Sequence, residues 1–216
     1  MATGVLHNFQ SSLIVSISST FVVVFIGALA GYAIARFKAG GNFVPFWVLS
    51  QRMLPPIAFV LPIFLIYSTL GLVNTYPGLA YAYAAFNLPY AVWMMRTFFE
   101  DLPAEIEEAA EVDGCGRLGA FARIAVPLAA PGIVATVIFT YILAWNEFLF
   151  ALVLMRSVNM FTVPVTEYIF YYGATSGARY NEASLQALLA ILPVLALSIY
   201  IQKYLVRGLT FGAVKG

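Results

Sequence analysis

Apolar residues fill five long stretches of the chain, and short polar segments separate them. A helix needs about 20 consecutive apolar residues to cross a bilayer, and each stretch has about that length. The stretches are Leu13–Ala35, Phe43–Tyr67, Tyr76–Met95, Gly132–Leu154 and Leu185–Leu205. The pattern predicts an all-α, polytopic membrane bundle of about five transmembrane helices, with the whole chain, 1–216, as a single domain.

The second stretch carries signs of an irregular helix. It contains Pro55, Pro56 and Pro62, and Arg52 interrupts its apolar pattern. Proline removes backbone hydrogen bonds that only neighbouring helices or water replace inside a membrane. We therefore expect a bent helix that is buried in the bundle.

A polar segment with the sequence EEAAEVDGCGRLGAFARIAVP, residues 107–127, stands out between the third and fourth stretches. A helix is predicted to begin near Asp101 as its cap, with Pro103 and acidic residues in the first turn. Gly114 should end this helix in a left-handed conformation, and a second short helix is expected over Leu118–Val126. A narrow stripe with small residues at its centre should suit packing into a groove. Its members are Leu102, Ile106, Ala109, Ala110 and Asp113.

Positive residues near the ends of the apolar stretches predict the orientation of the chain. Cytoplasmic loops carry the excess of Lys and Arg. Eight such residues fall on one side and two on the other, Arg156 and Arg179. The eight are Arg36, Lys38, Arg96, Arg117, Arg123, Lys203, Arg207 and Lys215. We expect a cytoplasmic C-terminus, a cytoplasmic 107–127 segment, an external N-terminus and an external loop over about 155–184.

Composition agrees with a membrane protein and excludes several functions. The chain is 62% apolar and 10% charged, with a mean hydropathy of +0.89. A net charge of +1 gives no basic footprint for nucleic acid. The single cysteine, Cys115, cannot form an intramolecular disulfide, and the single histidine, His7, makes no metal site. We expect no catalytic residues, metal or cofactor in this chain.

The polar segment has three further interpretations. Gly114, Gly116 and Gly119 match G-x-G-x-x-G, but an acidic helix precedes them where a dinucleotide site needs a strand. The clustered glutamates suggest a metal site or acid-base chemistry. However, carboxylates on an exposed helix are usually a solvated face, and no histidine joins them. A charged interhelical loop without function is the remaining alternative from pattern alone.

The spacing Glu108-Ala109-Ala110, Gly114, Ile124 and Val126-Pro127 resembles the EAA loop of binding-protein-dependent ABC importer permeases. Only Val126 departs, because the family usually has leucine before this proline. The stretches NLPYAVWMMRTFFEDLPAEIEEAAEVDG, YILAWNEFLFALVL, FTVPV and YLVRGLTFGAVKG are similar to the carbohydrate-uptake subfamily, in particular its second, maltose-type permease. The resemblance covers nearly the whole chain.

The resemblance implies an ABC importer transmembrane-domain fold and a set of partners. The EAA loop, 100–127, would form a cytoplasmic coupling helix that docks on an ABC ATPase dimer, which binds ATP and Mg. The coupling residues would be Ile106, Glu108, Ala109, Ala110, Asp113, Gly114, Arg117, Ile124 and Pro127. A second homologous permease and an extracytoplasmic solute-binding protein would complete an inner-membrane importer for a sugar or sugar derivative. The C-terminal tail would approach the ATPase dimer.

This chain differs from the family in the number of its predicted spans. Permeases of this type usually have six spans with a cytoplasmic N-terminus, and the first of these has no counterpart here. Either the start is truncated or this is a five-span variant.

Glu147 is the ionisable group best placed inside the membrane, with Trp145 and Asn146 beside it. Such groups usually face a cavity or a partner. Glu147 either lines the translocation path or stabilises helix packing, and Arg52 has the same two interpretations.

Two other features leave alternatives open. The GALAG sequence at Gly27–Gly31 is a small-xxx-small pattern that permits close helix contact, or a chance match in a glycine-rich span.

The chain has no G-x-x-x-x-G-K-[ST] loop, so energy for active transport must come from another subunit. The alternative function is a stand-alone secondary transporter or channel, and a membrane enzyme is a weaker one.

Overall fold

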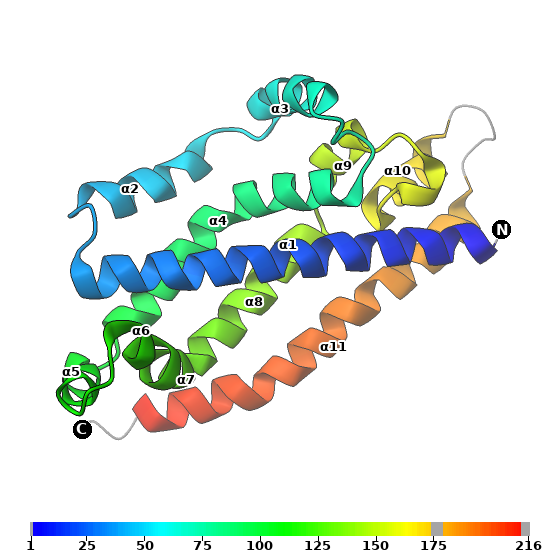
Figure 1. Cartoon of the computed structure of the whole chain (residues 1–216). Helices are drawn as coiled ribbons and strands as arrows, with labels where there is room; N and C mark the ends of the chain where they lie inside the picture. Colours follow the sequence, from blue (N-terminus) through cyan, green and yellow to red (C-terminus); the bar gives the residue numbers. More distant parts are fainter. Residues whose placement is uncertain (1, 174–178, 213–216) are drawn as a thin grey trace. The chain divides into compact units, whose positions relative to one another are not determined.

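The computed structural model describes residues 2–173 and 179–212, and every regular element in these ranges is a helix (Figure 1). The all-α prediction is confirmed. Three long helices contain the first, third and fifth predicted stretches: α1 (Ala2–Phe37), α4 (Tyr76–Glu100) and α11 (Tyr180–Gly212).

Two described helices are each long and apolar enough to cross a membrane, α1 over Val5–Phe37 and α11 over Tyr180–Tyr200. Two bent helix pairs raise this to four if each pair forms one span. The 25-residue α4 is not among these candidates, because four tyrosines and Asn87 make it less apolar than α1. The third predicted stretch is therefore a helix of spanning length with a mixed surface.

The second stretch is not one helix. It forms α2 (Phe43–Ser50), a 3-10 turn (Gln51–Met53) and α3 (Ile57–Thr69), with a bend of 94° between Phe43–Met53 and Ile57–Thr69. Adjacent prolines 55 and 56 explain the break, since a residue that precedes proline avoids the α conformation. The expected bend is confirmed, but the expected burial is wrong within this chain, because Phe43 and Phe46 are 70% and 68% exposed.

The fourth stretch is also interrupted. It forms α8 (Ala130–Trp145) and α9 (Leu149–Leu154), and residues Asn146–Phe148 between them are not helical. The preceding segment, Arg117–Leu128, meets α8 at a bend of 75°. The predicted continuous span over Gly132–Leu154 is therefore wrong at the position of Asn146 and Glu147.

The chain divides into two compact units. The first unit comprises Met1–Phe21, Leu54–Phe86 and Tyr141–Ser198, and the second comprises Val22–Met53, Asn87–Thr140 and Ile199–Gly216. The first unit includes a 3-10 turn (Val158–Met160) and α10 (Val163–Tyr172), and its core is built on Leu79, Tyr83, Phe150 and Leu154. The second unit has a core of alanines, two aromatic residues and one methionine. These are Ala28, Tyr32, Met95, Phe99, Ala125 and Ala129.

Within the second unit, glycines bring α1 close to α4. A Cβ atom added at Gly27 would lie 2.8 Å from Ala91 Cβ, and one added at Gly31 would lie 2.7 Å from the Arg96 backbone nitrogen. Side chains of ordinary size cannot fit at these contacts. The close-contact interpretation of GALAG is confirmed.

Candidate coupling loop and translocation residues

The polar segment begins with α5 (Ala104–Val112), which starts later than expected. Pro103 is the N-terminal cap residue. The Asp101 backbone N–H donates to Thr97 O at 3.1 Å and so continues the turn that ends α4. The prediction that Asp101 caps the helix is wrong, because the chain turns between Asp101 and Ala104 before α5 begins.

Gly114 ends α5 as predicted, with φ of +88°. Its backbone N–H donates to Glu111 O at 3.1 Å, and the Cys115 N–H donates to Ala110 O at 2.9 Å. This hydrogen-bond pair is the Schellman arrangement, in which a left-handed residue closes the helix end. No atom lies within 4 Å of a Cβ placed at Gly114, so only its backbone conformation demands glycine.

Glu107 fixes α5 to α1 inside the second unit. Its Oε2 accepts a hydrogen bond from Tyr32 Oη at 2.6 Å, and its Oε1 accepts from Arg36 Nε and Nη2 at 2.8 and 2.7 Å. Arg36 Nη2 also donates to Leu102 O at 3.0 Å. Glu107 is only 6% exposed, so the carboxylate and the guanidinium form a largely buried, charge-assisted pair.

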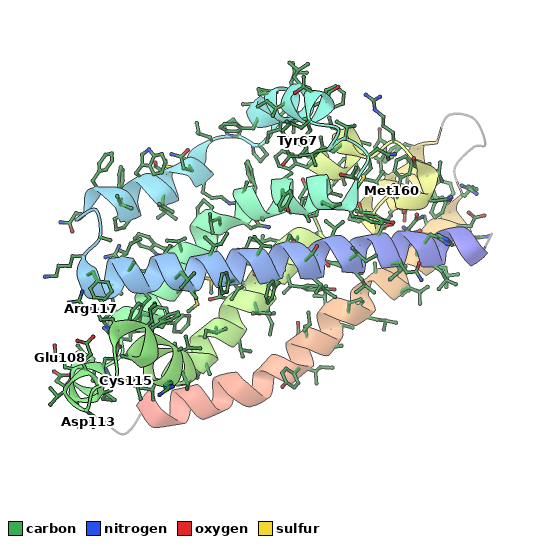
Figure 2. The ribbon with its side chains drawn as sticks, viewed as in Figure 1. Tyr67, Glu108, Asp113, Cys115, Arg117 and Met160 are labelled. Carbon is green, nitrogen blue, oxygen red and sulfur yellow. The ribbon has the colours of Figure 1, made fainter. Side chains whose placement is uncertain are left out.

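The opposite face of α5 is exposed in this chain. Ile106, Glu108, Ala109 and Asp113 all lie on the exposed surface, and Val112 is 87% exposed. Figure 2 labels Glu108 on α5, Asp113 directly after its last residue, Cys115 in the turn that follows and Arg117 at the start of α6. The expected stripe is therefore divided: Ala110 is partly buried, and Leu102 packs against the core of the second unit.

The second short helix is irregular. It consists of α6 (Arg117–Ala120), a π-helical segment (Phe121–Ala125) and α7 (Val126–Leu128), where a single α-helix over Leu118–Val126 was expected. The Phe121 ring centroid lies 4.7 Å from that of Tyr32, so this segment packs against α1. Ile124 is partly buried and Pro127 is exposed.

Arg117 and Leu118 lie on the exposed surface at the start of α6. The Arg117 guanidinium carbon lies 5.4 Å from the centroid of the Phe37 ring, and the Leu118 side chain is 81% exposed. Val112 and Leu118 therefore add two exposed apolar side chains beside the residues singled out from the sequence.

The three residues proposed for the translocation path differ in burial and in hydrogen-bond partners within the first unit. Trp145 is 3% exposed and donates from Nε1 to Ala190 O at 3.2 Å, whereas Asn146 is exposed and donates from Nδ2 to Ile142 O at 2.8 Å. Glu147 accepts hydrogen bonds from the backbone N–H groups of Phe150 and Ala151 at 3.0 and 3.3 Å. These contacts favour the packing interpretation of Glu147, because its carboxylate satisfies the N-terminus of α9. Asn146 is the member of the set with an exposed surface.

Arg52 lies in the second unit, and its guanidinium carbon is 4.3 Å from the centroid of the Tyr90 ring. A cation over an aromatic face at this distance is an attractive contact. The contact joins the 3-10 turn that follows α2 with helix α4. It therefore favours the packing interpretation of Arg52.

Several residues of this site were not found from the sequence. Glu107 was counted only as one of the acidic residues near the start of a helix, and Arg36 only as a positive residue near the end of a span. They are 71 residues apart, and no local pattern pairs them. Val112 was not singled out although it lies three residues after Ala109, and Leu118 lies beyond Gly114, where the stripe has ended.

Comparison with known proteins identifies the family of this chain. Residues 7–211 match the family described as binding-protein-dependent transport system inner membrane component. The trehalose/maltose transport system permease protein MalG of Thermococcus litoralis is 35% identical over 96% of this chain and 74% of its own length. The trehalose transport system permease protein SugB of Mycobacterium tuberculosis is 37% identical over 96% of this chain and 78% of its own length.

Solved structures show the same fold. A bacterial ABC transporter involved in import of the acidic polysaccharide alginate superposes with a TM-score of 0.76 at 23% identity, covering 93% of this chain and 75% of that chain. The MetNI methionine ABC transporter superposes with a TM-score of 0.74 at 16% identity, covering 94% of this chain and 95% of that chain.

The helical fold and the exposed loop helix define a membrane permease of the ABC importer class. The chain belongs to the binding-protein-dependent transport system inner membrane component family. It is therefore a permease subunit and not itself a catalytic one, and its family works with an ATPase and a solute-binding protein.

Proposed function

We propose that this permease forms part of the import path for a sugar or sugar derivative and couples transport to ATP hydrolysis through α5. The observation that carries the proposal is the two-sided character of α5. One side is held to α1 by the buried Glu107–Arg36 pair, at an Nη2–Oε1 distance of 2.7 Å, and the other presents exposed apolar and acidic side chains. A helix held in this way transmits a force applied to its exposed face.

The exposed face supports a docking role for the predicted coupling residues. It combines apolar Ile106, 44% exposed, and Val112, 87% exposed, with small Ala109 and acidic Glu108. Exposed apolar side chains rimmed by charges are typical of protein interaction sites. The partner in this proposal is an ABC ATPase dimer with a preformed cleft and a basic group near Glu108. Arg117, Ile124 and Pro127 support the loop from the segment that follows.

The sugar assignment rests on relatives. MalG of Thermococcus litoralis is named for trehalose/maltose transport and SugB of Mycobacterium tuberculosis for trehalose transport, and both are at least 35% identical to this chain. Asn146, exposed at the break between α8 and α9, is the proposed cargo-facing member of the Trp145–Glu147 set. A solute-binding protein delivers the cargo to the outer side.

The remaining parts of the proposal concern assembly. A second homologous permease completes the path, and the ATPase binds ATP and Mg, so this chain holds no cofactor of its own. The complex lies in the inner membrane with the C-terminus of this chain in the cytoplasm. Residues 213–216 of the C-terminal tail, proposed to approach the ATPase dimer, lie outside the described residues.

Substitutions on the exposed face test the docking role. Glu108→Lys reverses a charge, Ala109→Leu adds bulk and Val112→Asp places a charge at an apolar contact. Each variant should insert in the membrane at the parent level but lose co-purification with the ATPase and transport-coupled ATP hydrolysis. Glu111→Lys is the matched control, because Glu111 is also exposed but lies about 120° around the helix from the centre of this face. If all three variants retain the ATPase and transport like the control, α5 is only a solvated loop helix.

A further inference from the structure

The first unit contains a cavity of about 450 Å³ between the start of α1, α10 and the start of α11. This volume lies within the range of about 300–1,000 Å³ that is usual for small-molecule sites. Most of the cavity surface is apolar, including Val5, Phe161 and Ile169. The polar lining residues are Asn8, Thr166, Arg179, Glu182 and Gln186.

Two polar lining side chains have unmet acceptors. Asn8 and Gln186 are 3% and 1% exposed, and neither Asn8 Oδ1 nor Gln186 Oε1 has a hydrogen-bond partner. The orientation of the Gln186 amide is fixed, because its Nε2 donates to Val163 O at 2.9 Å and to Thr166 Oγ1 at 3.0 Å. A buried amide oxygen without a donor costs roughly 1–3 kcal/mol. Both oxygens belong to residues that line one cavity, and a molecule there that donates hydrogen bonds could satisfy them.

The charges at the cavity give no preference for an ionic ligand. Arg179 and Glu182 form an ion pair at 2.9 Å, so the lining carries no net charge. The Arg179 guanidinium carbon also lies 4.6 Å from the centroid of the Phe170 ring. An anion would face two amide oxygens of like partial charge, and a quaternary ammonium group has no proton to donate. A neutral molecule with hydroxyl groups meets both requirements.

Tyrosines beside the cavity mark its depth in the membrane. Ring centroids form a continuous series from Tyr168 to Tyr172 at 5.1 Å, Tyr172 to Tyr171 at 6.4 Å and Tyr171 to Tyr180 at 6.0 Å. Tyr172 and Tyr180 are 73% and 63% exposed. Exposed tyrosines at the start of an apolar span lie at the level of lipid head groups. At this level, hydroxylated head groups as well as solutes would be within reach of the cavity.

We propose that this cavity binds one neutral, hydroxyl-bearing molecule whose hydroxyl groups donate to Asn8 Oδ1 and Gln186 Oε1. The apolar lining packs against the carbon skeleton of the ligand. Two sources carry this chemistry, the sugar head group of a glycolipid and a free sugar.

The test uses the full-length chain with its co-purifying partners in phosphatidylcholine nanodiscs, since phosphocholine has no hydrogen-bond donor. One arm adds monoglucosyl diacylglycerol and the other adds trehalose, and native mass spectrometry and titration measure stoichiometry and Kd. One molecule should bind per chain in one arm, and Asn8→Leu should weaken Kd by roughly tenfold. Binding in the lipid arm identifies a glycolipid site, and binding in the trehalose arm a free-sugar site.

Thr20→Val is the matched control, because Thr20 Oγ1 is also buried without a partner but does not line the cavity. Leu185→Trp is a second variant, which enlarges an apolar lining residue without removing a polar group, and it should weaken binding. The proposal is overturned if the parent chain binds neither compound, which would leave water as the occupant. It is also overturned if Asn8→Leu and Leu185→Trp bind as tightly as Thr20→Val.

Discussion

Neighbouring glutamates in the coupling loop have opposite environments. Glu107 is 6% exposed and bonded to Tyr32 and Arg36, whereas Glu108 lies on the exposed face of α5. One residue is 100° around a helix from the next. Adjacent residues of α5 can therefore have different roles: Glu107 holds the helix to α1, and Glu108 lies on its exposed face. Substitution of either residue should therefore affect a different property.

Glu107→Gln should destabilise the protein because it leaves the Arg36 guanidinium buried without a counter-charge. Arg36 and Glu107 side chains are 13% and 8% exposed, so the loss should approach the roughly 3–5 kcal/mol typical of a broken buried pair. Glu108→Gln, the control, should stay within about 0.5 kcal/mol of the parent. Denaturant unfolding in detergent micelles measures both. The charge-swapped pair Arg36→Glu with Glu107→Arg should regain part of the loss, and equal stability of the two Gln variants would refute the anchoring role.

Gly114→Val should strain the turn that ends α5. A β-branched residue at φ of +88° costs roughly 1–3 kcal/mol, and the surrounding space is open, so the cost comes from the backbone. Gly116→Val is the matched control, because Gly116 has φ of −63° in an extended conformation and is equally open. ATPase co-purification should fall for Gly114→Val only. The same yield for both variants would show that the turn conformation is unimportant for docking.

Local sequence signals predicted the residues whose role depends on backbone conformation or surface position. Gly114 was found because a helix that ends after an acidic run needs a left-handed residue. The anchoring role of Glu107 was not found, because it depends on Arg36, which is 71 residues away in the sequence. Glu147 was found as a special residue, but its role at the N-terminus of α9 required a break in the helix that apolar composition does not reveal.

At the scale of elements, apolar length predicted where helices lie but not where they break. The first, third and fifth stretches are continuous helices, while the second and fourth are interrupted at Leu54–Pro56 and Asn146–Phe148. The prolines gave a signal for the first break. The second has no proline or glycine, and the side chain of Glu147 stabilises it by accepting backbone hydrogen bonds.

Gly31→Ala should separate α1 from α4 in the second unit. The added methyl carbon would lie 2.7 Å from the Arg96 backbone nitrogen, which cannot move without the helix. Overpacking of this kind costs roughly 1–3 kcal/mol. Gly116→Ala adds the same methyl group in open space and serves as the control in thermal unfolding experiments. Equal midpoints would mean that the helix contact yields without cost.

For the whole molecule, the distribution of charge alone predicts the orientation in the membrane. In a Cys115→Ser background, a cysteine at the exposed position Gly41 should be labelled only from the cytoplasm, and one at the exposed position Asn159 only from outside. The expected pattern follows from the excess of Lys and Arg on the Gly41 side. Labelling of intact cells with an impermeant maleimide, with and without permeabilisation, measures both. The reverse pattern would place α5 outside and contradict the coupling role.

The Arg36–Glu107 pair also sets an order of events during synthesis. The two residues are 71 positions apart, and chains grow at roughly 5–20 residues per second. Arg36 is therefore made about 4 to 14 s before its carboxylate partner exists. Throughout that interval the cation at the end of the first helix is without its native counter-charge, and water or lipid head groups must solvate it. The end of α1 thus reaches its final hydrogen-bonding state only after the loop between the third and fourth apolar stretches has been made.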